Sequence, residues 1–286
     1  MSPFLQLAAL GVAQGSFLLL ASLGFALTRR VEGFLNIAHA QYLSVSAFVT
    51  FFLNNTLGLH FAGAALAGVL AAIGVGFLVG KVVFEPIRRL GPAVALITSV
   101  GVVYMLEGII EIAVGTGSFL VTLPRLAPVR VGPVTITFYQ VMVVIAALVV
   151  TLLTAWYLER TRMGTAIRIT SLDRNLGASR GVDVRRASNA AWIVSSALAG
   201  IAGVALAVLG ALTTTKGFEQ ILIILAVSLL AGVGSISALA ISAFAIGIAR
   251  EISLLWISAG FRDIIAFGIV ILVLIFMPNG IAGRTE

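Results

Sequence analysis

The stretch FAGAALAGVLAAIGVGFLVGKVV, residues 61–83, decides what kind of fold this chain can adopt. It contains no charged residue before Lys81, and nearly all of its residues are apolar or glycine. A helix needs roughly 20 consecutive, predominantly apolar residues to cross the hydrocarbon core of a bilayer. The stretch therefore predicts one membrane-spanning helix.

Eight further apolar stretches surround this one, bounded by charged residues or by glycine and proline. The nine stretches are 4–27, 34–53, 61–83, 92–115, 135–158, 188–212, 219–233, 236–256 and 262–277. The second and the seventh are the shortest or most polar, so either is a candidate for a broken or re-entrant helix. The pattern predicts an all-α polytopic membrane bundle of eight or nine transmembrane helices, forming one transmembrane domain over residues 1–286.

The composition agrees with a membrane protein. Hydrophobic residues make up 60% of the chain and charged residues only 10%, whereas a soluble domain carries about 25% charged residues. The net charge of +7 would suggest nucleic acid in a soluble protein. Cytoplasmic loops of membrane proteins collect Lys and Arg, so we expect a lipid bilayer and no nucleic acid. With no cysteine and two isolated histidines, neither a disulfide nor a metal site is expected.

The basic residues predict the orientation in the membrane. With nine crossings and an outside N-terminus, the cytoplasmic segments hold 13 of the 18 Lys and Arg residues. The five others lie outside or near outer helix ends: Arg125, Arg130, Lys216, Arg250 and Arg262. This excess predicts an outside N-terminus and a cytoplasmic C-terminus. An eight-helix arrangement stays open and would move one terminus. Segment 116–134 contains three prolines and is expected to be an irregular outer loop.

The longest polar stretch is ERTRMGTAIRITSLDRNLGASRGVDVRR, residues 159–186. Its middle contains helix formers and no proline, which predicts a helical cytoplasmic loop over about 159–187. Gly177 and Gly181 are four residues apart, so on a helix they would share one face and permit close approach by another surface. The stretch is either a helix that docks on a cytoplasmic partner or an ordinary positively charged loop. Its length and its glycine pair favour docking.

Asn36 and His39 are polar residues at the start of the second apolar stretch. Polar groups inside a membrane are costly unless satisfied, and they often line a path. The simpler interpretation, which we favour from sequence, is that Asn36 caps the helix and His39 makes a structural hydrogen bond.

Glu107 and Glu111 are the deepest acidic residues, and their spacing places them on one helical face. They form either a proton site or an interior or interface contact near the outer loop, within reach of Arg125 or Arg130. We favour the contact, because further members of a proton relay are not evident in the sequence.

The chain lacks the sequence pattern of a phosphate-binding loop. Gly232-Val233-Gly234-Ser235 is typical of a tight turn between helices, and Gly80-Lys81 is followed by Val82 rather than Ser or Thr. We therefore expect no enzyme activity and no cofactor bound by this chain. The small residues Ala199, Gly200 and Gly203 indicate close helix packing.

Four segments stand out as motifs: FLNIAH (34–39), RMGTAIR (162–168) continuing to Asp173, Gly177, Gly181, Val182 and Arg185, LAGIAG (198–203) with GVGS (232–235), and FMPNGIAG (276–283). Together they resemble the permease family of branched-chain amino-acid ABC importers, of the LivH and LivM kind. They occur in the order and with the spacing of that family, and the short chain fits the LivH type better. Ala40, Gly177 and Ser237 depart from the family pattern.

The resemblance implies an inner-membrane (plasma-membrane) permease for branched-chain or other hydrophobic amino acids, or for related small solutes. A second permease, LivM-like or another copy, would complete the path. A periplasmic binding protein would deliver the solute, and two cytoplasmic ATPases would use ATP and Mg. Asn36 and His39 would lie beside the path. The 159–187 loop would contact the ATPases through Arg162, Gly164, Arg168, Asp173, Arg174, Gly177, Gly181 and Arg185.

Two other classes stay open from the sequence. One is a self-sufficient secondary transporter or channel that uses Glu107 and Glu111 as a proton site, although secondary transporters often contain internal repeats and none is convincing here. The other is a membrane scaffold subunit without a path.

Overall fold

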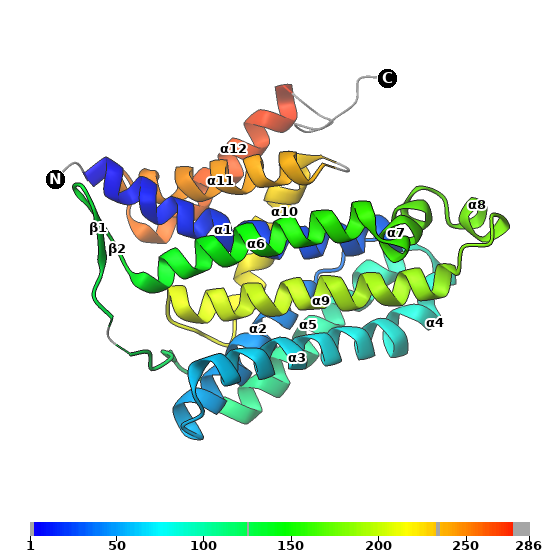
Figure 1. Cartoon of the computed structure of the whole chain (residues 1–286), viewed down its shortest axis with the longest axis horizontal. Helices are drawn as coiled ribbons and strands as arrows, with labels where there is room; N and C mark the ends of the chain where they lie inside the picture. The colour runs from blue at the N-terminus through cyan, green and yellow to red at the C-terminus, as the bar shows by residue number, and fades with distance from the viewer. Residues whose placement is uncertain (1–2, 125, 233–234, 277–286) are drawn as a thin grey trace. The chain divides into compact units, whose positions relative to one another are not determined.

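The computed structural model describes residues 3–124, 126–232 and 235–276, and these are mostly helical (Figure 1). Arg125, the middle of the predicted 232–235 turn and the tail motif beyond Phe276 lie outside the described residues. The α-helices are α1 (Pro3–Glu32), α2 (His39–Phe51), α3 (Phe61–Val79), α4 (Glu85–Ile87), α5 (Pro92–Val114), α6 (Phe138–Arg160), α7 (Arg162–Leu172), α8 (Arg174–Ser179), α9 (Val184–Leu209), α10 (Lys216–Ala231), α11 (Ile236–Ile252) and α12 (Arg262–Phe276). The shorter elements are η1 (Phe52–Thr56), η2 (Gly80–Phe84), η3 (Arg88–Leu90), β1 (Val129–Val131), β2 (Val134–Ile136), η4 (Ser253–Leu255) and η5 (Ala259–Phe261).

Six helical segments among the described residues are long and apolar enough to cross a membrane. They coincide with six of the nine predicted stretches, so the prediction of a multi-spanning helical protein is confirmed. The other three stretches form shorter α-helices. Helix α2 has 13 residues before η1, α10 has 16 residues and α12 has 15 residues. The six segments are Pro3–Glu32, Phe61–Leu90, Pro92–Val114, Phe138–Arg160, Val184–Leu209 and Ile236–Leu255.

The second predicted stretch is helical only in part. Gly33, with φ of +77°, follows the last residue of α1, and its N–H donates to the Arg29 carbonyl oxygen at 3.0 Å. Residues 33–38 are not helical, and α2 begins at His39. A positive φ suits glycine, which has no Cβ to clash with the backbone. The chain therefore separates α1 from α2 by a short non-helical segment.

The described chain divides into two compact units, and the prediction of one domain over 1–286 stays a prediction. One unit comprises residues 24–122 and 150–221, in which α2, α3 and α9 pack against one another. A Cβ on Gly203 would lie 2.2 Å from the Leu43 carbonyl oxygen, and one on Gly200 would lie 2.9 Å from the Val69 Cα. The predicted small residues of α9 therefore let the backbones of α2 and α3 approach closely.

The other unit comprises residues 1–23, 123–149 and 222–286. In it α11 packs closely on α1, where a Cβ on Gly11 would lie 2.5 Å from the Ile248 Cα. The prediction of a wholly irregular 116–134 loop is wrong, because β1 and the first residue of β2 fall within it and the two strands form an antiparallel hairpin. The Gln6 amide donates to the Thr135 carbonyl oxygen (2.7 Å) and accepts from the Thr135 N–H (2.9 Å), which ties the hairpin to α1.

Candidate functional site

The predicted 159–187 loop forms two short helices, which we call the α7–α8 segment (residues 161–183). The Thr161 hydroxyl accepts from the Gly164 N–H at 2.9 Å and caps α7. Asp173 has extended backbone angles (φ −153°, ψ 115°), and its carboxylate accepts from the N–H groups of Asn175 (2.8 Å) and Leu176 (3.0 Å). Asp173 therefore ends α7 and caps α8, as its short carboxylate favours.

The expectation that Gly177 and Gly181 share a helical face is wrong, because α8 ends at Ser179. Gly181 has φ of +81°, and the Val182 N–H donates to the Gly177 carbonyl oxygen at 3.0 Å. This pattern is a Schellman motif, in which glycine supplies the left-handed residue after a helix. Gly177 is buried, and an added Cβ would lie 3.3 Å from the Ile169 side chain, so it packs inward against α7.

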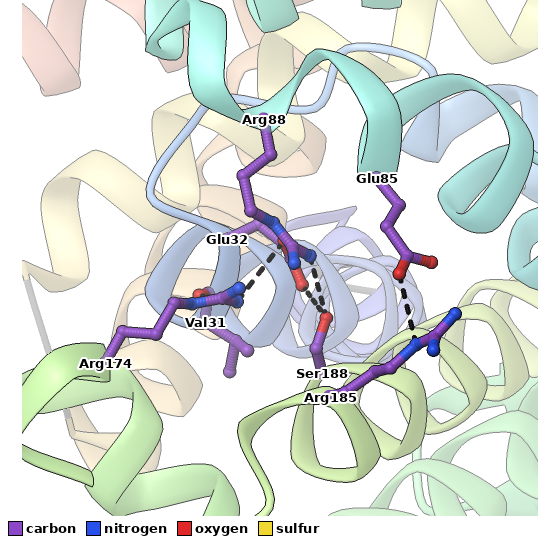
Figure 2. Close-up of polar contacts among 7 residues, drawn as sticks. All are labelled: Val31, Glu32, Glu85, Arg88, Arg174, Arg185 and Ser188. Atoms are coloured by element: carbon purple, nitrogen blue, oxygen red, sulfur yellow. Dashed lines mark hydrogen bonds and ion pairs between the residues drawn. The ribbon is translucent and has the colours of Figure 1, made fainter. Parts of the chain in front are cut away.

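A buried carboxylate joins the α7–α8 segment to the ends of the long helices (Figure 2). Glu32 has only 2% of its side chain exposed, and its Oε2 accepts from Arg88 Nη2 (2.5 Å) and Nε (3.1 Å). Ser188 Oγ donates to the other oxygen, Oε1, and accepts from Arg88 Nη2 at 2.9 Å. Arg174 Nη2 lies 3.5 Å from Oε2 and donates to the Val31 carbonyl oxygen at 3.1 Å. We call Glu32, Arg88, Arg174 and Ser188 the Glu32 cluster.

The Glu32 cluster draws one residue from each of four elements. Glu32 ends α1, Arg88 begins η3, Arg174 begins α8, and Ser188 lies in the second turn of α9. Burial lowers the pKa of the Arg174 guanidinium, while the Glu32 carboxylate raises it and Arg88 lowers it. A guanidinium stays protonated in proteins, so two positive charges flank one buried negative charge. Removing the carboxylate would leave them facing each other, at a cost of about 3 kcal/mol or less, since both guanidinia are partly exposed.

Apolar packing holds the same elements together. Ile167 of α7 is buried in a cluster with Leu27 and Val31 of α1 and with Ala187 and Ala191 of α9. Tyr157, Leu158 and Met163 pack against this cluster. The α7–α8 segment is therefore attached to the ends of α1 and α9 by a small core as well as by the Glu32 cluster.

The residues predicted to contact an ATPase divide into an inward-facing group and an exposed group. Gly164 and Gly177 are buried, and half-buried Arg174 reaches inward to Glu32. The sequence did not identify Leu172 and Leu176, which are 82% and 54% exposed on either side of Asp173. Two leucines four residues apart in a strongly polar stretch were the available signal. The exposed members of the predicted set are Arg162, Arg168, Asp173, Gly181 and Arg185.

Asn36 and His39 are both fully buried. The expectation that Asn36 caps the second helix is wrong, because α2 has no side-chain cap. The Asn36 amide interacts with the Tyr42 hydroxyl and has no other hydrogen-bond partner among the described residues. His39 Nδ1 lies 3.4 Å from Ser195 Oγ, which donates to the Gly24 carbonyl oxygen at 2.9 Å. His39 therefore links α2 to α9, and the place of both residues beside a path stays a prediction.

Glu107 and Glu111 lie on α5, where Glu107 is half-buried and Glu111 is exposed. In the part of the chain that the structure describes, neither carboxylate forms a salt bridge. Arg125, one expected partner, lies outside that part. The role of the acidic pair stays untested.

The helices, the charged α7–α8 segment and the buried polar groups beside α2 together have the features of a membrane permease. Residues 7–274 match the model of a protein family described as "Branched-chain amino acid transport system / permease component". The chain belongs to this family. This permease is therefore a multi-pass membrane protein, and the members of its family are transport subunits.

Curated relatives resemble the permease over almost their whole length. The "High-affinity branched-chain amino acid transport system permease protein LivH" of Escherichia coli (strain K12) is 27% identical over 99% of this chain and 96% of its own. The permease protein BraD of Pseudomonas aeruginosa is 23% identical over 99% and 97%. A "Probable branched-chain amino acid transport permease protein LivH" of Methanocaldococcus jannaschii is 25% identical over 95% and 90%.

Proposed function

We propose that this permease is the membrane subunit of an ABC importer for branched-chain or other hydrophobic amino acids. The observation that carries the proposal is the family match over residues 7–274, together with relatives named for branched-chain amino-acid transport. The permease lies in the inner membrane and works with a second permease, either LivM-like or another copy. Two cytoplasmic ATPases that use ATP and Mg drive it, and a periplasmic binding protein delivers the solute.

The proposed topology has nine crossings, with the N-terminus outside and the C-terminus in the cytoplasm. The distribution of Lys and Arg supports it, with 13 of 18 in the segments assigned to the cytoplasm. Three of the nine helices, α2, α10 and α12, are shorter than a usual span of roughly 20 residues. A tilt or a thinner local bilayer accommodates short helices.

The proposed ATPase contact is the outer surface of the α7–α8 segment. Leu172 and Leu176 expose apolar surface between exposed arginines, outside the helices assigned to the membrane. An apolar centre with a polar, charged rim is typical of a protein interface. The arginines favour an acidic partner surface. Asp173 is exposed at this contact, and it also supports the contact by capping α8.

The test is uptake by the reconstituted complex. Purified permease, its second permease and the ATPases are placed in proteoliposomes, and uptake of radiolabelled leucine is measured with binding protein and ATP. Uptake that requires ATP, the ATPases and the binding protein is the expected result. Urea and phenylalanine, compared in the same assay, define the solute class. Uptake by the permease alone, driven by a pH gradient and lost in Glu107→Gln, would instead establish the secondary-transporter alternative.

A further inference from the structure

We infer that Glu32 is a positioning residue that transmits movement of the α7–α8 segment to the beginning of α2. The inference rests on the proposed function, because the α7–α8 segment moves only if an ATPase binds it. Glu32 acts without contacting the solute. It holds the end of α1 in one of two positions, according to whether Arg174 is bound to it.

The first step is the position of Glu32 in the chain. It is the last residue of α1, and the non-helical residues 33–38 follow it directly and lead into α2. Gly33 is exposed and has φ of +77°, and it joins Glu32 to the buried side chains of Phe34 and Asn36. A shift at Glu32 therefore reaches these two side chains through a single conformationally permissive residue.

The second step is the difference between the two arginines. Arg88 contacts Glu32 Oε2 through Nη2 (2.5 Å) and Nε (3.1 Å), and it also contacts Ser188. Arg174 contributes one longer contact of 3.5 Å and a hydrogen bond to the Val31 carbonyl oxygen. Hydrogen bonds between ionised groups strengthen as they shorten and as their number rises. Arg88 is therefore the fixed partner, and Arg174, on the element that meets the ATPase, is the exchangeable one.

The third step is the charge that remains when Arg174 leaves. A buried carboxylate without a partner would be strongly unfavourable. Glu32 keeps the Arg88 guanidinium and the Ser188 hydroxyl in that state, so its negative charge stays compensated. Arg174 is 29% exposed already and gains water on leaving. The arrangements with and without the Arg174–Glu32 contact therefore differ by a small free energy. A small difference is what allows the binding of a partner to shift the equilibrium between them.

The experiment measures solute taken up per ATP hydrolysed in the reconstituted complex. In Arg174→Gln we expect ATP hydrolysis to persist while this ratio falls about fivefold, the low end of ordinary coupling between sites. Glu32→Gln should lower the ratio in the same way. The double variant should be no worse than Glu32→Gln alone, because both changes remove one interaction. The control is Glu219→Gln, which breaks the 3.3 Å pair between exposed Glu219 and Lys216 of α10 and should leave the ratio unchanged.

An unchanged ratio in Arg174→Gln would overturn the inference. So would hydrolysis and uptake that fall together in proportion to the amount of assembled complex, because that result indicates a structural role only. Arg174→Gln leaves Glu32 bound to Arg88, so this variant decides the question even where Glu32→Gln does not insert. A wild-type complex without ATP-dependent uptake would refute the proposed function and the inference together, whereas coupled wild-type uptake with normal variants refutes the inference alone.

Discussion

Single glycines determine how closely the helices of this permease can pack. Lipid tails are as apolar as leucine, so helices in a membrane gain little from burying apolar side chains against each other. Contact between backbones and hydrogen bonds across helices take over this role. On α9, Gly203 meets the α2 backbone at Leu43, and Gly200 meets the α3 backbone at Val69.

Replacing Gly203 with alanine should therefore lower stability. The new Cβ would lie 2.2 Å from a backbone oxygen, and no side-chain rotation can relieve that overlap. We expect a loss of about 1–3 kcal/mol, the usual range for overpacking. Thermal unfolding of the detergent-solubilised chain, followed by the loss of the monodisperse peak in size-exclusion chromatography, measures the change.

Gly74→Ala is the control for this prediction. Gly74 is exposed on α3, and an added Cβ would meet no atom within 4 Å beyond its own helix backbone and chain neighbours. Alanine favours helix over glycine by about 1 kcal/mol, so this variant should be at least as stable as the wild type. Equal thermal midpoints for Gly203→Ala and Gly74→Ala would contradict the close approach of α2 and α9.

At the scale of elements, the α7–α8 segment is organised to present a defined outer surface. Caps at Thr161 and Asp173 and the turn at Gly181 satisfy the backbone groups at three of its helix ends. Ile167 and Gly177 face inward, and Leu172 and Leu176 face outward. Because its inner side packs on α1 and α9 before a partner binds, a partner that approaches the outer side meets a preformed surface.

The double variant Leu172→Ser, Leu176→Ser should reduce the ATPase that copurifies with the permease about tenfold or more, because central apolar contacts carry most interface energy. Both leucines are exposed, so insertion and yield should not change. Pull-down of tagged permease with quantification of bound ATPase is the measurement. Leu120→Ser, at a leucine that is 65% exposed in the 115–137 connection, is the control and should retain the ATPase. Full retention by the double variant would show that the contact lies elsewhere.

On the scale of the whole molecule, the number of membrane crossings between two loops determines whether they face the same side of the membrane. Helix α6 is one of the six segments long enough to span, and it separates the 115–137 connection from the α7–α8 segment. In the proposed topology α6 crosses the membrane, so these two regions lie on opposite sides of it. The arginines of the α7–α8 segment favour the cytoplasm for this segment.

Single cysteines test this orientation cleanly, because residues 1–286 contain no cysteine. Ser118 and Asn175 are exposed residues in the two regions. A membrane-impermeant maleimide should label Ser118→Cys in intact cells with the outer membrane permeabilised, and Asn175→Cys only after the inner membrane is opened. Labelling of Asn175→Cys from the periplasm would reverse the topology and remove the proposed ATPase contact.

Much of the fold was predictable because hydropathy is a local property. The stretch 61–83 is apolar whatever it packs against, and it forms part of one of the six long segments. The candidate site was predictable only in part. Arg174 was selected for its place in a basic stretch, but its partner Glu32 lies 142 residues earlier in the chain, without a local signal to connect them. The sequence did not predict the helix break at Asp173, because helix-forming residues lie on both sides of it. The role of Asp173 as the cap of α8 becomes evident only from the packed structure.

The sequence by itself determined that this chain is a multi-spanning helical permease and which family it belongs to, because apolar length and family motifs are written in consecutive residues. Only the tertiary structure decided which side of the α7–α8 segment is free, and which charges meet at the end of α1. The physical reason is that a buried carboxylate acquires its partners from whichever elements the packing brings to it. Arg88, Arg174 and Ser188 reach Glu32 from three separate elements, and no spacing along the chain specifies that arrangement.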